Sequence, residues 1–295
     1  MLPRVAYVTH AGSAAQDPDL PLALAAFERH GLDGRACAWD GEVDWADFDL
    51  VLVRSAWDYC ERRQEFLRWA RSVEQETVLA NPALTLARNT DKTYLRDLAG
   101  RGIPTIDTVW FEPGDRASDC RRMLDERGWS RLVVKANIGD GARDTQLVQS
   151  APEAIALAER LVSCGRVAMI QPYLPDEERA GEVSVIVLGG AISHAVSRIP
   201  TLTARGTGQA HGLVQVSDEL VDVVERTMAI AASGEHLLYA RVDLVPHAGQ
   251  WLLIELEATE PCLFLNMDPD APHRLARAVR NAVTQGAWQW DSASG

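Results

Sequence analysis

The hydrophobic positions in the first third of the chain alternate between two spacings. Short apolar runs are typical of strands buried on both faces, and apolar residues every three to four positions are typical of helices. Strands are predicted at Val5–Thr9, Leu50–Arg54 and Val78–Ala80, and helices at Leu20–Arg29 and Gln64–Gln75. This β-α-β-α-β order predicts a small α/β domain with a parallel sheet over residues 1–85.

The pattern becomes less regular after residue 85. We predict a helix over Asp91–Gly100 within a connecting segment at 86–102, and then a small subdomain at 103–171. The segment Asn137–Arg143 is too polar and too rich in glycine for a regular element. The elements predicted for the subdomain are a strand at Thr105–Phe111, a helix at Ala117–Arg127, strands at Leu132–Lys135 and Gln146–Val148, a helix at Pro152–Val162 and a strand at Val167–Gln171.

Residues 172–295 predict antiparallel strands with helices, which is an α+β arrangement. Val183–Leu188 and Ala191–Ser197 flank Gly189-Gly190, a dipeptide typical of a two-residue hairpin. A second hairpin is predicted from Tyr239–Val245 and Trp251–Glu257. The remaining predicted elements are a strand at Leu213–Val216 and helices at Leu220–Ala232 and Pro272–Ala282.

Composition and charge narrow the class of protein. Apolar residues make up 47% and charged residues 24% of the 295 positions, as in ordinary soluble globular proteins. The formal net charge of −13 repels phosphate backbones, so a nucleic acid is not expected as a partner. No stretch approaches the roughly 20 apolar residues of a membrane span, and a cytoplasmic location is expected. The five scattered cysteines contain no CxxC pair and suggest neither a zinc site nor a disulfide framework.

The second predicted hairpin carries three carboxylates. Alternate residues of a strand face the same way, so Glu255 and Glu257 share a face, as do Arg241 and Asp243 on the other strand. Pairing of the strands would bring the carboxylates of Asp243, Glu255 and Glu257 together. Oxygen ligands of this kind select magnesium or manganese over zinc. Because the intervening residues are apolar, burying these carboxylates without a cation would be costly.

Two lysines and the end of one predicted strand suggest a nucleotide-binding site. Lys135 ends an apolar run directly before the glycine-rich segment, and Lys92 begins a helix; both suit nucleotide phosphates. Backbone groups of Gln171, Pro172 and Tyr173, where two subdomains join, are candidates for an adenine contact. The sequence matches neither GxxxxGK[ST] nor GxGxxG, which argues against a P-loop NTPase and a classical dinucleotide dehydrogenase.

Substrate residues are predicted from three places in the chain. Arg54 ends a buried strand of the first domain, where ligands gather in open α/β sheets, and suits a carboxylate. The residues that follow it on the same loop are further candidates: Ser55, Trp57 and Asp58. His194 and Arg198 share one face of the first hairpin, and His211 follows a glycine-containing loop. Ordinary packing for Trp57 and a structural role for His194 remain alternatives.

Taken in this order, the elements resemble the ATP-grasp superfamily, whose members include glutathione synthetase and D-alanine–D-alanine ligase. The resemblance implies a pre-ATP-grasp domain at 1–85, a nucleotide-clamping subdomain at 103–171 and a C-terminal subdomain with the metal site at 172–295. It also implies a small amino-acid-like substrate and a homodimer. For the nucleotide, the resemblance implies phosphate binding by Lys92 and Lys135, a lid loop from Gly139 to Arg143 with Asp140 and Gly141, an adenine hinge at Gln171, Pro172 and Tyr173, and contacts from Glu182. For the reaction, it implies catalysis by Arg241, Lys135 and Arg198. For the metal, it implies magnesium binding by Asp243, Glu255 and Glu257.

Three segments indicate one branch of the superfamily. They are Arg54-Ser55-Ala56-Trp57-Asp58-Tyr59, Ser193-His194-Ala195-Val196-Ser197-Arg198 and Glu255 to Pro261. Within that branch the chain is similar to the D-cycloserine synthetase family. This resemblance implies ATP- and Mg-dependent activation of the O-ureido-D-serine carboxylate as an acyl phosphate, followed by ring closure through the ureido nitrogen. The alternatives are a ligase that uses an external amine, a kinase, or a non-catalytic nucleotide-binding protein.

One departure from the superfamily pattern concerns the metal. The usual pattern ends Glu-x-Asn, whereas this chain has Glu255-Leu256-Glu257. The additional carboxylate favours cation binding and leaves the number of bound ions open.

Overall fold

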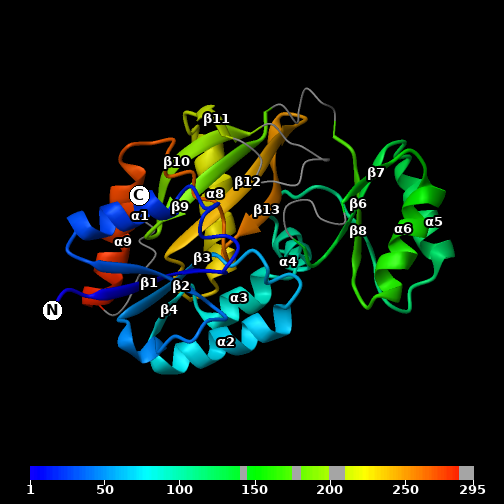
Figure 1. Ribbon diagram of the computed structural model, residues 1–295. Coiled ribbons are helices and arrows are strands. Elements are labelled where there is room, and N and C mark those ends of the chain that lie inside the picture. The colour runs from blue at the N-terminus through cyan, green and yellow to red at the C-terminus, as the bar shows by residue number, and fades with distance from the viewer. Residues whose placement is uncertain (140–144, 175–180, 199–209, 286–295) are drawn as a thin grey trace.

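A computed structural model describes residues 1–139, 145–174, 181–198 and 210–285, which contain three sheets (Figure 1). The first is a parallel sheet in the order β2-β1-β3-β4, which confirms the parallel α/β arrangement predicted for the start of the chain. One face packs against α1 and α9, and the other packs against α2 and α3. Its elements are β1 (Arg4–Thr9), α1 (Leu20–Arg29), β2 (Asp33–Ala38), a 3-10 turn at Trp45–Asp47, β3 (Leu50–Ser55), α2 (Arg63–Glu76), β4 (Val78–Ala80) and α3 (Ala83–Asn89).

The strand β2 was not predicted from the sequence. Its residues Asp33–Ala38 contain no large aliphatic side chain, and none of them is fully buried. The strand lies at the edge of the sheet and pairs only with β1. Its position depends on that backbone pairing, which leaves little hydrophobic signal in the sequence.

The second sheet is antiparallel, in the order β5-β8-β6-β7, and α5 and α6 cover one face of it (Figure 1). The prediction of a strand over Thr105–Phe111 is wrong in its first half, because residues 104–106 bond to Leu253 of the third sheet instead. The elements are β5 (Val109–Phe111), α5 (Ala117–Arg127), β6 (Leu132–Ala136), β7 (Gln146–Val148), α6 (Ala151–Ser163) and β8 (Ala168–Pro172).

The helix predicted from Asp91 begins later, as α4 (Tyr94–Gly100). The Asp91 side chain accepts hydrogen bonds from the N–H and the hydroxyl of Thr93, at 3.1 and 2.9 Å. The Lys92 N–H donates to the Asn137 carbonyl at 2.8 Å. These bonds hold the chain in a turn between α3 and α4, so a regular helix starts only at Tyr94.

The third sheet is antiparallel, in the order β11-β10-β9-β12-β13, and both predicted hairpins are confirmed. Gly189 and Gly190 have φ angles of 58° and 82°, which glycine adopts without steric cost. The strand predicted at Leu213–Val216 lies earlier in the chain, as β11 (Ala210–Leu213), and Ser217 caps the next helix. The elements are β9 (Val183–Leu188), β10 (Ala191–Arg198), β11, α8 (Asp218–Ala232), β12 (Tyr239–His247), β13 (Gln250–Glu257) and α9 (Ala271–Gln285).

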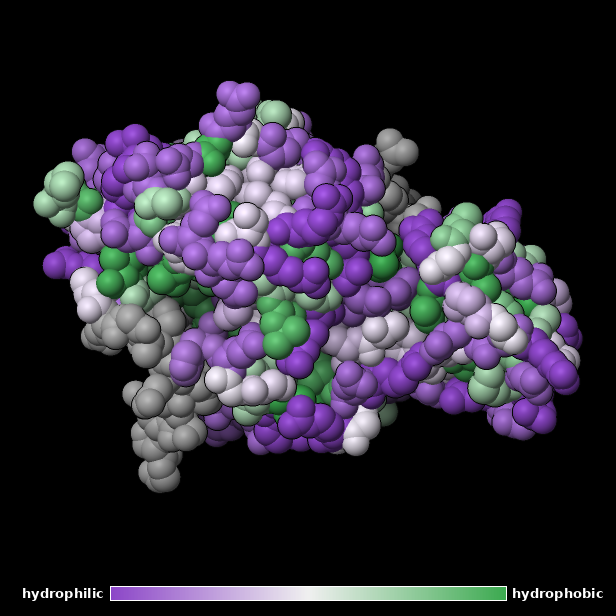
Figure 2. Space-filling view, turned by 90° about the horizontal axis from the view of Figure 1, so that it is seen from below, coloured by the Kyte–Doolittle hydropathy of each residue, from purple (hydrophilic) through white to green (hydrophobic). Residues whose placement is uncertain are grey.

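The two faces of the third sheet have different surroundings. Val185, Val242 and Leu244 face α4 and α8 in an apolar core. The opposite face contributes Ile186 and Val196 to the core shared with the first sheet, and it also carries the polar residues described below. Figure 2 shows a largely hydrophilic surface with scattered apolar patches and a lobe that projects from the main body. Within the described ranges, no helix is both long enough and apolar enough to span a membrane.

Candidate active site

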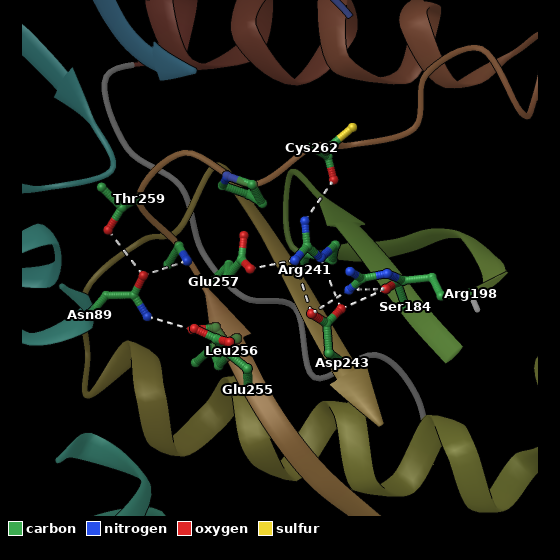
Figure 3. Close-up of polar contacts among 12 residues, drawn as sticks. Asn89, Ser184, Arg198, Arg241, Asp243, Glu255, Leu256, Glu257, Thr259 and Cys262 are labelled. Carbon is green, nitrogen blue, oxygen red and sulfur yellow. Dashed lines mark hydrogen bonds and ion pairs between the residues drawn. The ribbon is translucent and has the colours of Figure 1, made fainter. Parts of the chain in front are cut away.

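The pairing of β12 with β13 sets the geometry of the site. Arg241 lies opposite Glu257, and Asp243 lies opposite Glu255, in the antiparallel register. Directly opposed residues point to the same face of a sheet, so all four polar side chains share one face. The neighbouring strand β9 places Ser184 opposite Asp243 on that face (Figure 3). The shared face predicted from the hairpin is therefore present.

Arg241 is the most extensively bonded residue of the site. Its Nε and Nη2 atoms donate to the two oxygens of Asp243, both at 2.9 Å. Nη2 also donates to Glu257, and Nη1 donates to the Cys262 carbonyl at 3.4 Å. This bidentate geometry fixes the plane of a guanidinium that is only 5% exposed. Arg241 thus joins both strands to the loop that follows β13.

Asp243 is held in its ionised form. Ser184 Oγ donates to Oδ1 at 2.6 Å, and Arg198 Nη1 donates to Oδ2 at 3.0 Å. Burial raises the pKa of Asp243, but Arg241 and Arg198 outweigh burial and bring the pKa down to about 2. Asp243 therefore carries a negative charge throughout the physiological pH range.

The pKa of Glu257 is instead raised, which favours its protonated form. Burial raises its pKa, Arg241 lowers it, and the negative charges of Glu255 and Asp243 raise it further, to about 7. Burial and the two neighbouring carboxylates therefore favour the protonated form of Glu257 over its ionised form. A bound divalent cation would lower this pKa and favour the ionised carboxylate.

Two lysines approach the carboxylates from other elements. Lys92 Nζ lies 2.8 Å from Glu255 Oε1 and donates to the Gly139 carbonyl at 2.7 Å. Burial lowers the pKa of Lys135, on β6, to about 8; Glu255 opposes this effect, and Lys92 adds to it. The structure therefore brings Lys92, Lys135 and Glu255 into one electrostatic environment. Of the predicted lid loop, Gly139 is described, whereas Asp140, Gly141, Ala142 and Arg143 lie outside the described residues.

The predicted adenine hinge lies at the end of β8. Gln171 is buried, and its Nε2 donates to the Thr108 hydroxyl at 2.8 Å. The Tyr173 N–H donates to the Arg131 carbonyl at 2.9 Å, and the Arg131 guanidinium lies 4.0 Å from the centre of the Tyr173 ring. Pro172 is half-buried between them. Glu182 Oε1 lies 3.7 Å from Arg198 Nη1, so Glu182 is close to the carboxylate face.

Arg54 lies in the interior between the first and third sheets, and it is only 2% exposed. Its Nη2 donates to the Pro261 carbonyl and lies 3.8 Å from Asp19. Its guanidinium stacks on the Tyr239 ring, 4.8 Å from the ring centre. These contacts connect β3 to the loop after β13. Ser55 is also buried, and its carbonyl accepts hydrogen bonds from the first loop of the chain.

The other substrate candidates lie in different surroundings. Asp58 accepts hydrogen bonds from Trp39 Nε1 at 2.8 Å and from Arg62 at 3.2 Å, within the first domain. Trp57 is half-buried on the same loop. His194 is buried beside Ser193, and burial lowers its pKa. His211 is exposed on β11, at the opposite edge of the sheet from β13.

Three residues that contact the site were not predicted from the sequence. Ser184 lies two positions after Glu182 on the same face, so strand alternation was a sufficient signal for it. Asn89 and Tyr94 bind the backbone of Leu256, between Glu255 and Glu257. Their partner lies more than 160 positions away in the sequence, and no local pattern indicates such a contact.

The chemistry of the candidate ligands fits the magnesium ion that the resemblance implies. Asp243, Glu255 and Glu257 supply only oxygen atoms, which suits this metal, and the raised pKa of Glu257 favours an additional cation. In the part of the chain that the structure describes, no three or more His, Cys, Asp or Glu side chains gather closely enough to hold a metal. Each of these three carboxylates instead contacts an arginine or a lysine. The chemistry of the residues therefore fits the metal, although their carboxylates are directed at protein cations.

Comparisons with known proteins identify the family of the chain. A family model described as the N-terminal domain of D-cycloserine synthetase DcsG matches residues 5–81. The cycloserine biosynthesis protein DcsG of Streptomyces lavendulae is 35% identical over 290 residues, which cover 93% of this chain and 97% of that protein. The crystal structure of D-cycloserine synthetase DcsG has a TM-score of 0.86 and 31% identity, and it covers 95% of this chain and 100% of that one.

A more distant structure shows the same fold. The ATP-grasp ligase PsnB, solved with a phosphomimetic variant of a minimal precursor, Mg and ADP, has a TM-score of 0.67 at 18% identity, covering 96% of this chain and 100% of that one. The architecture and the matches together define an ATP-dependent ligase of the ATP-grasp type, which confirms the fold expected from the sequence. Within that class, the chain belongs to the D-cycloserine synthetase DcsG family.

Proposed function

We propose that this protein is an ATP- and Mg-dependent cyclo-ligase that converts O-ureido-D-serine to D-cycloserine. The observation that carries the proposal is the buried face of β12 and β13. There Arg241 and three carboxylates lie near Lys92 and Lys135, in a chain of the DcsG family. Binding alone does not require several buried carboxylates, so this arrangement favours an enzyme over a non-catalytic nucleotide-binding protein.

The charges of the site support binding of a metal–nucleotide complex. Four cations, Lys92, Lys135, Arg198 and Arg241, lie close to four carboxylates, Glu182, Asp243, Glu255 and Glu257. The formal charges of these eight groups sum to zero, so the negative charge of ATP would be uncompensated without divalent cations. Magnesium held by Asp243, Glu255 and Glu257 would supply that compensation and polarise the transferred phosphoryl group.

The residues of the chain would then act as follows. Lys92 and Lys135 bind the ATP phosphates, and Arg241 stabilises the charge that develops as the substrate carboxylate attacks the γ-phosphate. This step gives an acyl phosphate and ADP. The ureido nitrogen attached to oxygen attacks the activated carbonyl, the C–N bond forms and phosphate leaves. Water then removes the carbamoyl group as carbon dioxide and ammonia. Because both reacting groups belong to one molecule, the protein mainly has to orient the substrate.

The proposal is tested by incubating the purified protein with ATP, MgCl2 and O-ureido-D-serine, and by measuring ADP and D-cycloserine by mass spectrometry. Equal amounts of both products, without an added amine, are expected. ADP release that depends on an external amine would instead indicate the carboxylate–amine ligase alternative. If the intermediate does not react with hydroxylamine and a stable phosphate ester accumulates, the protein is a kinase.

The assignment of the site is tested by Asp243→Asn. Loss of this carboxylate removes a counterion of Arg241 and Arg198 and a proposed metal ligand, so we expect ADP formation to fall by about 100-fold or more. Asp222→Asn is the matched control, because Asp222 pairs only with Arg226 on the exposed surface of α8. Turnover of Asp243→Asn equal to that of the control would refute the metal assignment.

A further inference from the structure

The strand β13 lies at the edge of the third sheet, and among the described residues its outer side has no further strand of the sheet, although Leu253 bonds to residues 104 and 106. The N–H and C=O groups on such an edge need water or other protein groups as partners. At Leu256 both groups are bound by side chains. The Leu256 N–H donates to the Tyr94 hydroxyl at 2.9 Å. The Leu256 carbonyl accepts from the Tyr94 hydroxyl at 2.8 Å and from Asn89 Nδ2 at 2.7 Å.

Asn89 also binds the chain just beyond β13. Its Oδ1 accepts hydrogen bonds from the Ala258 N–H at 2.7 Å and from the Thr259 hydroxyl at 3.0 Å. Figure 3 shows Asn89 between Leu256 and Thr259, beside the carboxylates. Five side-chain hydrogen bonds from Asn89 and Tyr94 therefore hold the end of β13 in place.

The same segment, residues 89–94, also reaches the nucleotide side of the site. Lys92 lies between Asn89 and Tyr94, and its Nζ contacts both Glu255 and the Gly139 carbonyl. Its N–H donates to the carbonyl of Asn137, just beyond β6. One short segment thus bonds to the end of β13 and to the residues that follow β6.

The position of Leu256 gives these bonds a functional consequence. Leu256 lies between Glu255 and Glu257, and its own side chain is buried in the apolar core on the opposite face. A shift of the Leu256 backbone would displace both flanking carboxylates, because each is only one residue away. Groups that orient metal ligands in this way generally affect metal affinity by about 10- to 100-fold when they are removed.

We propose that Asn89 and Tyr94 are positioning residues for the Glu255 and Glu257 carboxylates, acting through the backbone of Leu256. This inference rests on the proposed function, which assigns those carboxylates to magnesium. A role limited to stabilising the edge of the sheet predicts a different result. In that case, loss of the Tyr94 hydroxyl lowers the free energy of unfolding and leaves the metal affinity of the folded protein unchanged.

The test removes the tyrosine hydroxyl at each of two positions, in two separate variants. Tyr94→Phe removes both bonds between this side chain and Leu256. Tyr7→Phe is the control, since the Tyr7 hydroxyl also makes a hydrogen bond, to Asp17 at 2.8 Å, but lies in the first domain. Binding of Mn2+ to the protein, in the presence of a non-hydrolysable ATP analogue, is measured by the loss of its free electron paramagnetic resonance signal relative to a sample that contains Mn2+ and the analogue without protein. Thermal unfolding of each variant is measured in parallel.

We expect the dissociation constant for Mn2+ to rise about 10-fold in Tyr94→Phe and to stay at the wild-type value in Tyr7→Phe. The Mg2+ concentration that gives half-maximal ADP formation should rise by a similar factor. Asn89→Ala, which keeps the bonds between Tyr94 and Leu256, provides a second variant if Tyr94→Phe does not fold, and the same direction of change is expected.

Two different results would overturn the inference, and only one of them would also overturn the metal assignment. If wild type binds Mn2+ with the ATP analogue and the variants at Tyr94 and Asn89 bind it equally well, the positioning role is refuted while the proposed function stands. If wild type itself binds no Mn2+ under these conditions, the metal assignment fails and the positioning role fails with it.

Discussion

Buried cations of this site differ in their response to pH. Against the effect of burial, Asp243 and Glu257 raise the pKa of Arg241, so its guanidinium stays protonated throughout the accessible pH range. Burial instead lowers the pKa of Lys135 to about 8, within the range where an enzyme is assayed. A lysine attracts a nucleotide phosphate only while it is charged, so the proposed role of Lys135 would make nucleotide binding sensitive to alkaline pH.

We therefore expect the affinity for ATP to fall as the pH rises through about 8. Below this pKa the free protein carries a charged Lys135, and above it the charge must be regained on binding. The dissociation constant of a non-hydrolysable ATP analogue should rise about 10-fold between pH 7 and 9.5, as measured by calorimetry. Lys135→Arg keeps its charge at both pH values and should show a much smaller rise. An equal rise in both proteins would exclude Lys135 as the titrating group.

At the residue scale, the sequence was informative where a relation is local. The alternation along β12 and β13 placed Asp243, Glu255 and Glu257 on one face, because that relation depends only on strand geometry. It could not place Arg54, whose contacts with Pro261 and Tyr239 arise only when two sheets pack together. Arg54 accordingly looked like a residue at an open sheet end and proved to be buried.

Among the elements, the connection after β4 is held by one buried amide. Asn81 Nδ2 donates to the carbonyls of Tyr239 and Ala258 at 2.9 and 2.7 Å, and its Oδ1 accepts from the Leu238 N–H at 2.6 Å. Its side chain thus satisfies three backbone groups at the start of β12 and the end of β13. A buried group that loses its partner is destabilising, so this position contributes substantially to stability.

Asn81→Ala should lower the free energy of unfolding by about 3 kcal/mol, because three buried backbone groups lose a partner. Chemical denaturation measures this value. Asn281→Ala, at an exposed position of α9, should change it by less than about 0.5 kcal/mol. A change of similar size in the two variants would show that water or neighbouring groups replace the Asn81 amide.

Elements with a strong hydrophobic period were predicted closely. The bounds of α1, α5, β7 and β9 agree with the sequence pattern. The errors fall where backbone pairing or side-chain hydrogen bonds decide the structure. β2 has no large aliphatic residue, and the first turn expected for α4 is replaced by the bonds of Asp91 and Lys92. Such interactions depend on partners from distant parts of the chain, which one sequence does not identify.

Across the whole molecule, a buried ion pair connects the first sheet to the active-site loop. Asp19 accepts hydrogen bonds from the N–H groups of Leu263 and Leu265, at 2.7 and 2.8 Å, and lies 3.8 Å from Arg54. Arg54 in turn binds the Pro261 carbonyl. Because the carbonyl of Cys262 in this loop accepts from Arg241, the first domain supports the site at a distance.

Arg54→Met should therefore lower the free energy of unfolding by about 3 kcal/mol, since it leaves the buried Asp19 without its counterion. Urea denaturation measures the change. Arg35→Met, which removes an exposed pair with Asp33, should cost less than about 1 kcal/mol. Unchanged stability together with a raised KM for O-ureido-D-serine would favour the role of substrate ligand that the sequence suggested for Arg54.

The contact of Tyr94 with Leu256 also has a consequence for how the protein is made. The two residues are 162 positions apart, and a ribosome that adds about 5 to 20 residues per second needs roughly 8 to 32 seconds to cover that distance. During this interval the emerging chain has Asn89, Lys92 and Tyr94 but lacks the strand they bind. The first parallel sheet can form early, whereas the candidate active-site face of β12 and β13 is completed only when the last third of the chain has left the ribosome. A nascent or prematurely terminated chain that ends before β13 is therefore expected to have no catalytic activity.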